Sequence, residues 1–117
     1  MILKELTTLF NGLCIPRSTN KFPNPAPDTF CVFTPISDMD IEYSDDYPEI
    51  ESCSVRIGIF TRKSWTELVR KIKTTLRDEG FIISNSLFIE HEVDTKFNHY
   101  NIDVEKLYLI GGKSCHL

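Results

Sequence analysis

Residues 51–80 have the sequence ESCSVRIGIFTRKSWTELVRKIKTTLRDEG, which predicts one strand that leads directly into one helix. In the first part of this stretch, Val55, Ile57 and Ile59 alternate with polar or small residues. A period of two residues is typical of a strand that buries one face and exposes the other. We therefore expect a strand over about residues 50–61, with these three side chains directed towards the core.

The second part of the stretch changes to the periodicity of a helix. Its apolar residues at helical spacing are Trp65, Leu68, Val69, Ile72 and Leu76. Ser64 precedes Glu67 by three residues, which is the spacing of a capping box. Gly80 stands where a helix commonly ends in a left-handed residue. The pattern predicts a helix over about residues 64–79 that packs on the preceding strand.

Working outward from this unit, the same criteria predict the rest of the fold. The other expected elements are a helix over 2–11, a brief strand over 13–15 and strands over 29–36, 87–93 and 100–110. Between them we expect a proline-rich connector over 16–28, a turn over 84–86 and a bulge near 105–106. The order α-β-β-β-α-β-β predicts an α+β fold, with a mainly antiparallel sheet of four to five strands and two helices on one face.

The composition is that of an ordinary globular domain. The 117 residues are 41% hydrophobic and 26% charged, which predicts one domain over 1–112 and a disordered tail over 113–117. No apolar run has the length of a membrane span, and the N-terminus lacks the apolar core of a signal peptide. Without a secretion signal, the four cysteines are expected to be free thiols, with Cys31 and Cys53 as small buried hydrophobes.

Charge is distributed unevenly along the chain. The formal net charge is −4, yet no Lys or Arg occurs between Lys21 and Arg56. The acidic residues of that interval are Asp28, Asp38, Asp40, Glu42, Asp45, Asp46, Glu49 and Glu51. The other 9 of the 17 acidic residues stand against all 13 basic ones, a balance of +4. We expect residues 37–49 to form a long hairpin tip or a mobile loop that repels DNA and suits a basic protein partner.

Other sequence patterns suggest candidate sites. Asp38, Asp40, Glu42 and Glu49 match positions of a calcium loop, but Tyr43 occupies the position that requires glycine. The basic residues of the second helix are Arg70, Lys71, Lys73 and Arg77, and we interpret them as a solvated helix face rather than a nucleic-acid site. No nucleophile motif and no complete phosphate-binding loop is present.

The histidines offer the remaining chemical hypothesis. His91 and His99 fall on either side of a predicted hairpin loop, with Glu92 nearby, so a metal site of two histidines and a carboxylate was considered. We interpret these residues as ordinary cross-strand polar neighbours. The sequence therefore predicts no catalytic residue, no metal and no cofactor.

If both helices cover one face of the sheet, the other face is left for a partner. Phe33, Phe60, Phe88 and Tyr100 are expected to contribute to that uncovered face. Together with the acidic segment they give the predicted interface residues: Phe33, Asp38, Asp40, Glu42, Asp45, Asp46, Arg56, Gly58, Phe60, Phe88 and Tyr100.

The chain resembles the small tail-completion, or tail-terminator, proteins of long-tailed bacteriophages and prophages. The residues that carry the resemblance are Cys14–Pro16, Ser54–Lys63, Glu67–Lys73, Gly80–Ile83, Leu87–Glu90 and Lys106–Ile110. The resemblance implies a structural protein without an active site, whose ring of six subunits closes the tail tube and joins it to the head. It also implies a tail-tube protein and head–tail connector proteins as partners, with DNA only as passing cargo and no membrane. The expected location is the virion and the bacterial host cytoplasm.

Within such a ring, the acidic segment is expected either to line the lumen, where negative charge lets DNA pass, or to dock a partner. Two alternatives remain open from the sequence. One is a small non-catalytic protein-binding module of another bacterial system. The other is a metal-dependent enzyme that uses His91, His99 and Glu92.

Overall fold

The computed structural model describes residues 2–19, 27–44 and 47–109, without the side chains of 37–49 and 109. The elements are α1 (Ile2–Gly12), β1 (Arg17–Thr19), β2 (Thr29–Ser44), β3 (Tyr47–Thr61), α2 (Thr66–Asp78), β4 (Ile82–His91) and β5 (Asn98–Leu109). This order confirms the predicted α+β arrangement. The predicted tail over 113–117, with Cys115, lies outside the described residues.

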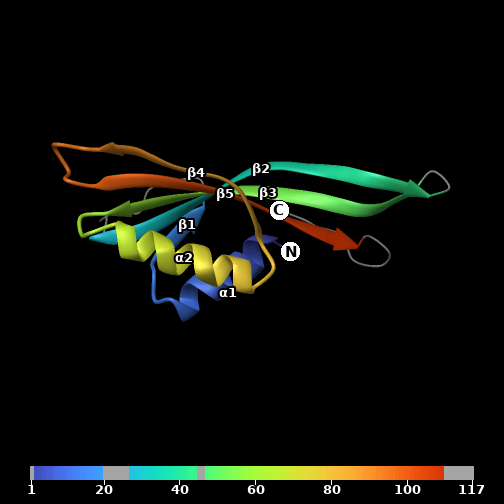
Figure 1. Ribbon diagram of the computed structural model, residues 1–117, viewed down its shortest axis with the longest axis horizontal. Coiled ribbons are helices and arrows are strands. Elements are labelled where there is room, and N and C mark those ends of the chain that lie inside the picture. The colour runs from blue at the N-terminus through green and yellow to red at the C-terminus, as the bar shows by residue number, and fades with distance from the viewer. Residues whose placement is uncertain (1, 20–26, 45–46, 110–117) are drawn as a thin grey trace.

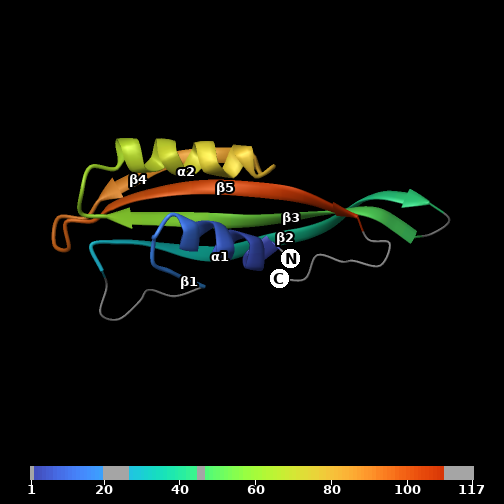
Figure 2. The ribbon, with the colours of Figure 1, turned by 90° about the horizontal axis from the view of Figure 1, so that it is seen from below.

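One twisted sheet of five strands, in the order β1-β2-β3-β5-β4, runs along the length of the molecule (Figure 1). Strand β1 pairs with β2 in parallel, and the other neighbours are antiparallel. Both helices lie on the same face, α1 over β2 and β3, and α2 over β4 and β5 (Figure 2). Within the described residues, neither helix has the length and apolar character that crossing a bilayer requires.

The predicted alternation on β3 determines the main core. Val55, Ile57 and Ile59 are completely buried and face the helices. The helices contribute their buried stripes to the same cluster: Ile2, Leu6 and Phe10 from α1, and Val69, Ile72 and Leu76 from α2. Each buried side chain of this size stabilises the fold by about 1.5–3 kcal/mol relative to an exposed one. The central strand therefore anchors both helices at once.

The predicted end of α2 is confirmed and its predicted start is wrong. Gly80 has φ +87°, and the amides of Gly80 and Phe81 donate to the carbonyls of Arg77 and Leu76, which is a Schellman motif. The helix begins at Thr66 rather than Ser64, and no side chain caps its first turn. The preceding residue, Trp65, already has helical backbone angles. Its indole packs on Phe88 and Tyr100, so apolar anchoring sets this end of the helix instead of a capping box.

Residues 13–15 do not form the brief strand that was predicted. Cys14 adopts a left-handed φ of 58°. Its amide donates to the carbonyl of Asn11, and the amide of Ile15 donates to the carbonyl of Phe10. These residues close the end of α1 in a second Schellman motif. The short strand β1 follows Pro16, inside the connector that was predicted to be irregular.

Strand β4 also differs from the prediction. Residues 84–86 continue the strand instead of forming a turn, and the hydroxyl of Ser84 donates to the carbonyl of Asp103. The pairing of β3 with β5 runs without interruption, so the predicted bulge near 105–106 is wrong. The register shifts occur on β4 instead, at Ser84 and Ile89. An extra residue on the edge strand β4 disturbs the hydrogen bonds to one neighbouring strand. A bulge in β5 would disturb the hydrogen bonds to two, because β5 lies between β3 and β4.

The acidic segment 37–49 belongs to a hairpin, the first of its two predicted forms. Strands β2 and β3 pair as far as Ser44 and Tyr47, so the strands continue well past the helices (Figures 1 and 2). We call residues 37–44 and 47–50 the arm. The arm gives the molecule its length, since the extents are 55 × 25 × 24 Å. Asp45 and Asp46 lie outside the described residues.

The cysteines differ from one another. Cys14 is an exposed free thiol, while Cys31 is a free thiol whose burial strongly raises its pKa. Cys53 is buried, as predicted, but its sulfur is bound in a disulfide. The prediction of a free thiol is therefore wrong for Cys53.

Candidate functional site

Three of the four aromatic residues assigned to the uncovered sheet face lie on the helix side instead. Phe33 is completely buried against Phe10 of α1. Tyr100 is buried and Phe88 is 37% exposed, and both contact Trp65 beside α2. The cause is the strand register, because Phe33 pairs with Ile57, and Tyr100 pairs with both Ile59 and Phe88. Paired residues share a face, so the prediction for these three residues is wrong.

Arg56, Gly58 and Phe60 do lie on the face opposite the helices. Arg56 makes a bidentate ion pair with Asp103 of the neighbouring strand, at 2.8 and 3.1 Å. These hydrogen bonds raise the pKa of Arg56. At Gly58, a Cβ atom would approach Cε1 of Phe60 to 3.3 Å. Glycine at this position therefore lets the Phe60 ring lie close over the strand.

A second core, which the sequence did not predict, occupies one end of this face. Its buried residues are Phe30, Val32, Phe60 and Phe97. His99 stacks on Phe60 at 4.1 Å, and the guanidinium of Arg62 lies 4.1 Å from the centre of the Phe97 ring. Phe97 stands in a segment that was predicted to be a hairpin loop. Its aromatic side chain directly before a strand was the one available signal.

The proposed histidine metal site is not formed. His99 pairs with Glu90, whereas His91 pairs with Asn98, so the two histidines point to opposite faces of the sheet. Each imidazole has an amide partner instead, Asn98 for His91 at 2.8 Å and Asn101 for His99 at 2.9 Å. Burial lowers the pKa of His99. Among the described residues, no three His, Cys, Asp or Glu side chains gather in a possible metal site.

The calcium-loop pattern is also not supported by the backbone. Asp38, Asp40 and Glu42 lie in the extended strand β2, and Glu49 lies in β3. A calcium loop instead winds around its ion. The side chains of these four residues lie outside the described part of the chain, so their contacts are not assigned.

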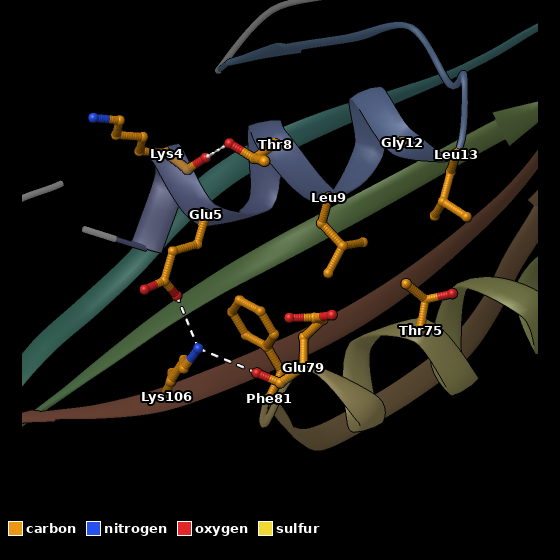
Figure 3. Close-up of a pocket in the computed structure, with 10 residues that line it drawn as sticks. All are labelled: Lys4, Glu5, Thr8, Leu9, Gly12, Leu13, Thr75, Glu79, Phe81 and Lys106. Carbon is orange, nitrogen blue, oxygen red and sulfur yellow. Dashed lines mark hydrogen bonds and ion pairs between the residues drawn. The ribbon is translucent and has the colours of Figure 1, made fainter.

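A cavity lies between the two helices (Figure 3). This central groove has a volume of about 690 Å³, and Leu9, Leu13 and Phe81 form its apolar part. Polar residues complete its lining: Lys4, Glu5, Thr8, Gly12, Thr75, Glu79 and Lys106. The sequence did not predict the groove, because it depends on how two helices far apart in the chain are spaced on the sheet.

One end of the central groove is closed by a polar network. The ammonium of Lys106 donates to Glu5 at 3.0 Å and to the carbonyl of Glu79 at 3.2 Å (Figure 3). Tyr108 donates a further hydrogen bond to Glu5 at 2.9 Å. Burial acts to raise the pKa of Glu5, but the hydrogen bonds from Lys106 and Tyr108 outweigh it and lower that pKa. Burial likewise raises the pKa of Tyr108, with a contribution from Glu5.

A smaller cleft lies on the opposite flank of α2, next to β4. This α2 cleft has a volume of about 260 Å³, and its lining includes Trp65, Arg70, Lys73, Arg77 and Tyr100. Lys73 donates to the hydroxyl of Tyr100 at 3.2 Å. Hydrogen bonds with Ser86 and Lys73 lower the pKa of Tyr100. Three of the four basic residues that were interpreted as a solvated helix face thus line one concave surface.

Comparison with known proteins adds no family to these observations. No protein-family model matches the chain, and no curated protein matches it. The function must therefore be argued from the fold and the surfaces of the chain itself.

Proposed function

We propose that this chain is a structural subunit that assembles into a ring, completes the tail tube of a phage or prophage, and joins it to the head. The observation that carries the proposal is the arm. It extends past the helix layer, and beyond Ile50 the pairing among the described residues joins β2 and β3 only. A two-stranded hairpin is at best marginally stable in water by itself. An arm of this kind is suited to a surface on another molecule.

Exposed apolar side chains on the sheet and in the loop after β4 further support assembly. They are Ile36, Ile82, Leu87, Phe88, Ile89, Val93 and Leu107. The register places Ile82, Leu87 and Leu107 on the same face as Arg56, opposite the helices. Apolar groups that remain outside the core of a small domain often mark contacts with other proteins.

The resemblance to tail-completion proteins, which implies a structural, non-enzymatic role, also supports the proposal. On this proposal the chain forms a ring of about six copies by head-to-tail contacts. Its partners are the tail-tube protein and the head–tail connector proteins, and DNA passes through without a specific site. The subunit assembles in the bacterial host cytoplasm and resides in the virion.

The second candidate function is a protein-binding module without catalysis. The central groove favours it, because an apolar floor with charged residues at one end fits a short amphipathic segment of a partner. The two candidates differ in the state of the purified chain. A binding module remains a monomer with one bound peptide, whereas a ring subunit associates with copies of itself.

The decisive experiment combines particle mass with electron microscopy. The purified full chain is measured alone and after incubation with the tail-tube protein encoded nearest to it. We expect closed rings at the ends of tail tubes, with a mass of about six chains. Tail tubes with bare ends, together with a chain that stays monomeric in their presence, contradict the proposal. The portal, capsid and tail-tube genes are also expected in the neighbourhood of its gene.

A further inference from the structure

The α2 cleft concentrates positive charge around an aromatic floor. Arg70, Lys73 and Arg77 recur at intervals of three and four residues, so they line one flank of α2. Trp65 and Tyr100 stack on each other at 5.4 Å and provide the apolar surface below them. Arg70 and Arg77 are exposed, while Lys73 is half-buried. A partner in this cleft therefore meets both cations and aromatic rings.

The charge of the cleft is not neutralised by nearby acids. The ion pairs among the described residues join Arg56 to Asp103, Arg62 to Asp28, and Lys106 to Glu5. None of these pairs includes a basic residue of the cleft. Lys73 is hydrogen-bonded only to the neutral hydroxyl of Tyr100 in the described part of the chain. The cleft is thus complementary to an anionic partner.

The arm has the opposite character. Its strand β2 carries Asp38, Asp40 and Glu42 among Met39, Ile41 and Tyr43, with a shift of register between Asp40 and Glu42. No Lys or Arg occurs anywhere between Lys21 and Arg56. Acidic residues interleaved with apolar ones match the combination of cations and aromatic rings in the α2 cleft.

The dimensions allow the two surfaces to meet only between copies. At about 3.3 Å per residue, the 8 residues from Ser37 to Ser44 span about 26 Å. The 13 residues of α2 span about 20 Å. The arm points away from the end of the molecule where α2 begins (Figure 1). An arm therefore does not reach the α2 cleft of its own copy.

We propose that the acidic arm of one copy docks in the α2 cleft of the next copy. The inference rests on the proposed ring-forming function and names the contact that builds the ring. The two contact surfaces differ, so the contact is heterologous and each copy offers one arm and one cleft. Such contacts repeat from copy to copy and close into a ring when the rotation per subunit permits.

The test reverses the charge of each surface separately in the full chain. One variant carries R70E and R77E, and the other carries D38K and D40K. The matched control is K71E, which changes an exposed lysine of the same helix outside the cleft. Self-association is followed by sedimentation and by the emission of Trp65, the single tryptophan, which lines the cleft. Circular dichroism verifies that each variant is folded.

We expect each double variant to lose self-association at least tenfold while K71E behaves as the parent chain. A mixture of the two double variants restores association, because the unchanged acidic arm of one variant meets the unchanged basic cleft of the other, and the two lysines introduced by D38K and D40K meet the two glutamates introduced by R70E and R77E. Association of the parent chain also weakens as salt rises from about 0.05 to about 0.5 M. The emission of Trp65 shifts in the mixture and in neither variant alone.

Other results overturn the inference. The docking is wrong if R70E/R77E associates as well as the parent chain, or if the mixture does not recover. It is also wrong if the parent chain stays monomeric at about 100 μM, far above the Kd of a specific contact. Binding of the α2 cations to a DNA duplex, with self-association unchanged, assigns the cleft to nucleic acid instead. If the chain forms open filaments instead of closed rings, the docking of arm and cleft is supported and the proposed tail function is contradicted.

Discussion

At the scale of single residues, backbone strain at Cys14 is the clearest feature open to a test. Its φ of 58° lies in the left-handed region, which costs a residue with a Cβ about 1–2 kcal/mol. Gly80 has the same position in the other Schellman motif and adopts φ +87° without that cost. The two helix ends thus use the same geometry with different residues.

We predict that Cys14→Gly raises the free energy of unfolding by about 1 kcal/mol, since strain relief exceeds the added entropy of the unfolded chain. The thiol is exposed, so little packing is lost. Cys14→Ala is the matched control, because it removes the thiol and keeps the Cβ. Urea unfolding measures both. An equal gain in the two variants attributes the effect to the thiol and contradicts the strain argument.

At the scale of elements, the network of Glu5, Lys106 and Tyr108 ties α1 to strand β5. Apart from this polar contact, α1 is held by its buried apolar stripe. Glu5→Gln keeps the shape and removes the charge that both donors contact. We predict a loss of about 1 kcal/mol at neutral pH, because the carboxylate is partly exposed and solvent weakens the pair.

The pH dependence of this loss follows from the pKa of Glu5. Folding lowers that pKa below 4.5, so the unfolded chain binds more protons as the pH falls through 4.5. The stabilisation is complete above pH 4.5 and disappears below it. Thermal unfolding of the parent chain and the variant should therefore converge in acid. The control is Asp94→Asn, which removes a charge from an exposed loop residue. If the parent chain and Glu5→Gln still differ in thermal stability in acid, the network does not explain the loss.

Some elements of this fold are predictable from the sequence and others are not, for physical reasons. Val55, Ile57 and Ile59 were assigned to the helix-facing core correctly, because a buried face gives β3 a strict period of two. On β4 and β2 the apolar residues occur on both faces, so the sequence does not indicate which alternating set faces the helices. For this reason Phe33 was assigned to the face opposite the helices, which is wrong. The start of α2 was also missed, since it depends on contacts of Trp65 with two strands that follow in the chain.

The candidate surfaces were less predictable than the fold. The basic residues of α2 were visible in the sequence, but their concave arrangement over Tyr100 depends on the register of β5 beneath the helix. The second core around Phe60 brings together three segments of the chain: β2, β3 and the residue before β5. Local patterns do not specify contacts of this kind, because each involves residues separated by tens of positions.

At the scale of the whole molecule, the structure separates a helix-covered body from an arm. Among the side chains that the structure describes, the helix-side core of β3 extends from Cys53 to Ile59. Asp40 pairs with Glu51, and a two-residue Asn-Gly turn joins strands in such a register. Replacing residues 41–50 by Asn-Gly therefore shortens the arm and leaves the body intact.

We predict that this shortened chain folds with a melting temperature within about 5 °C of the parent, because about 1 kcal/mol corresponds to a shift of that size in a domain of this length. The same chain is expected to lose self-association, since its arm no longer spans a neighbouring helix. Calorimetry and sedimentation measure the two properties on one sample. A variant that unfolds would make the arm part of the folding core. One that still forms rings would show that the arm is dispensable for assembly.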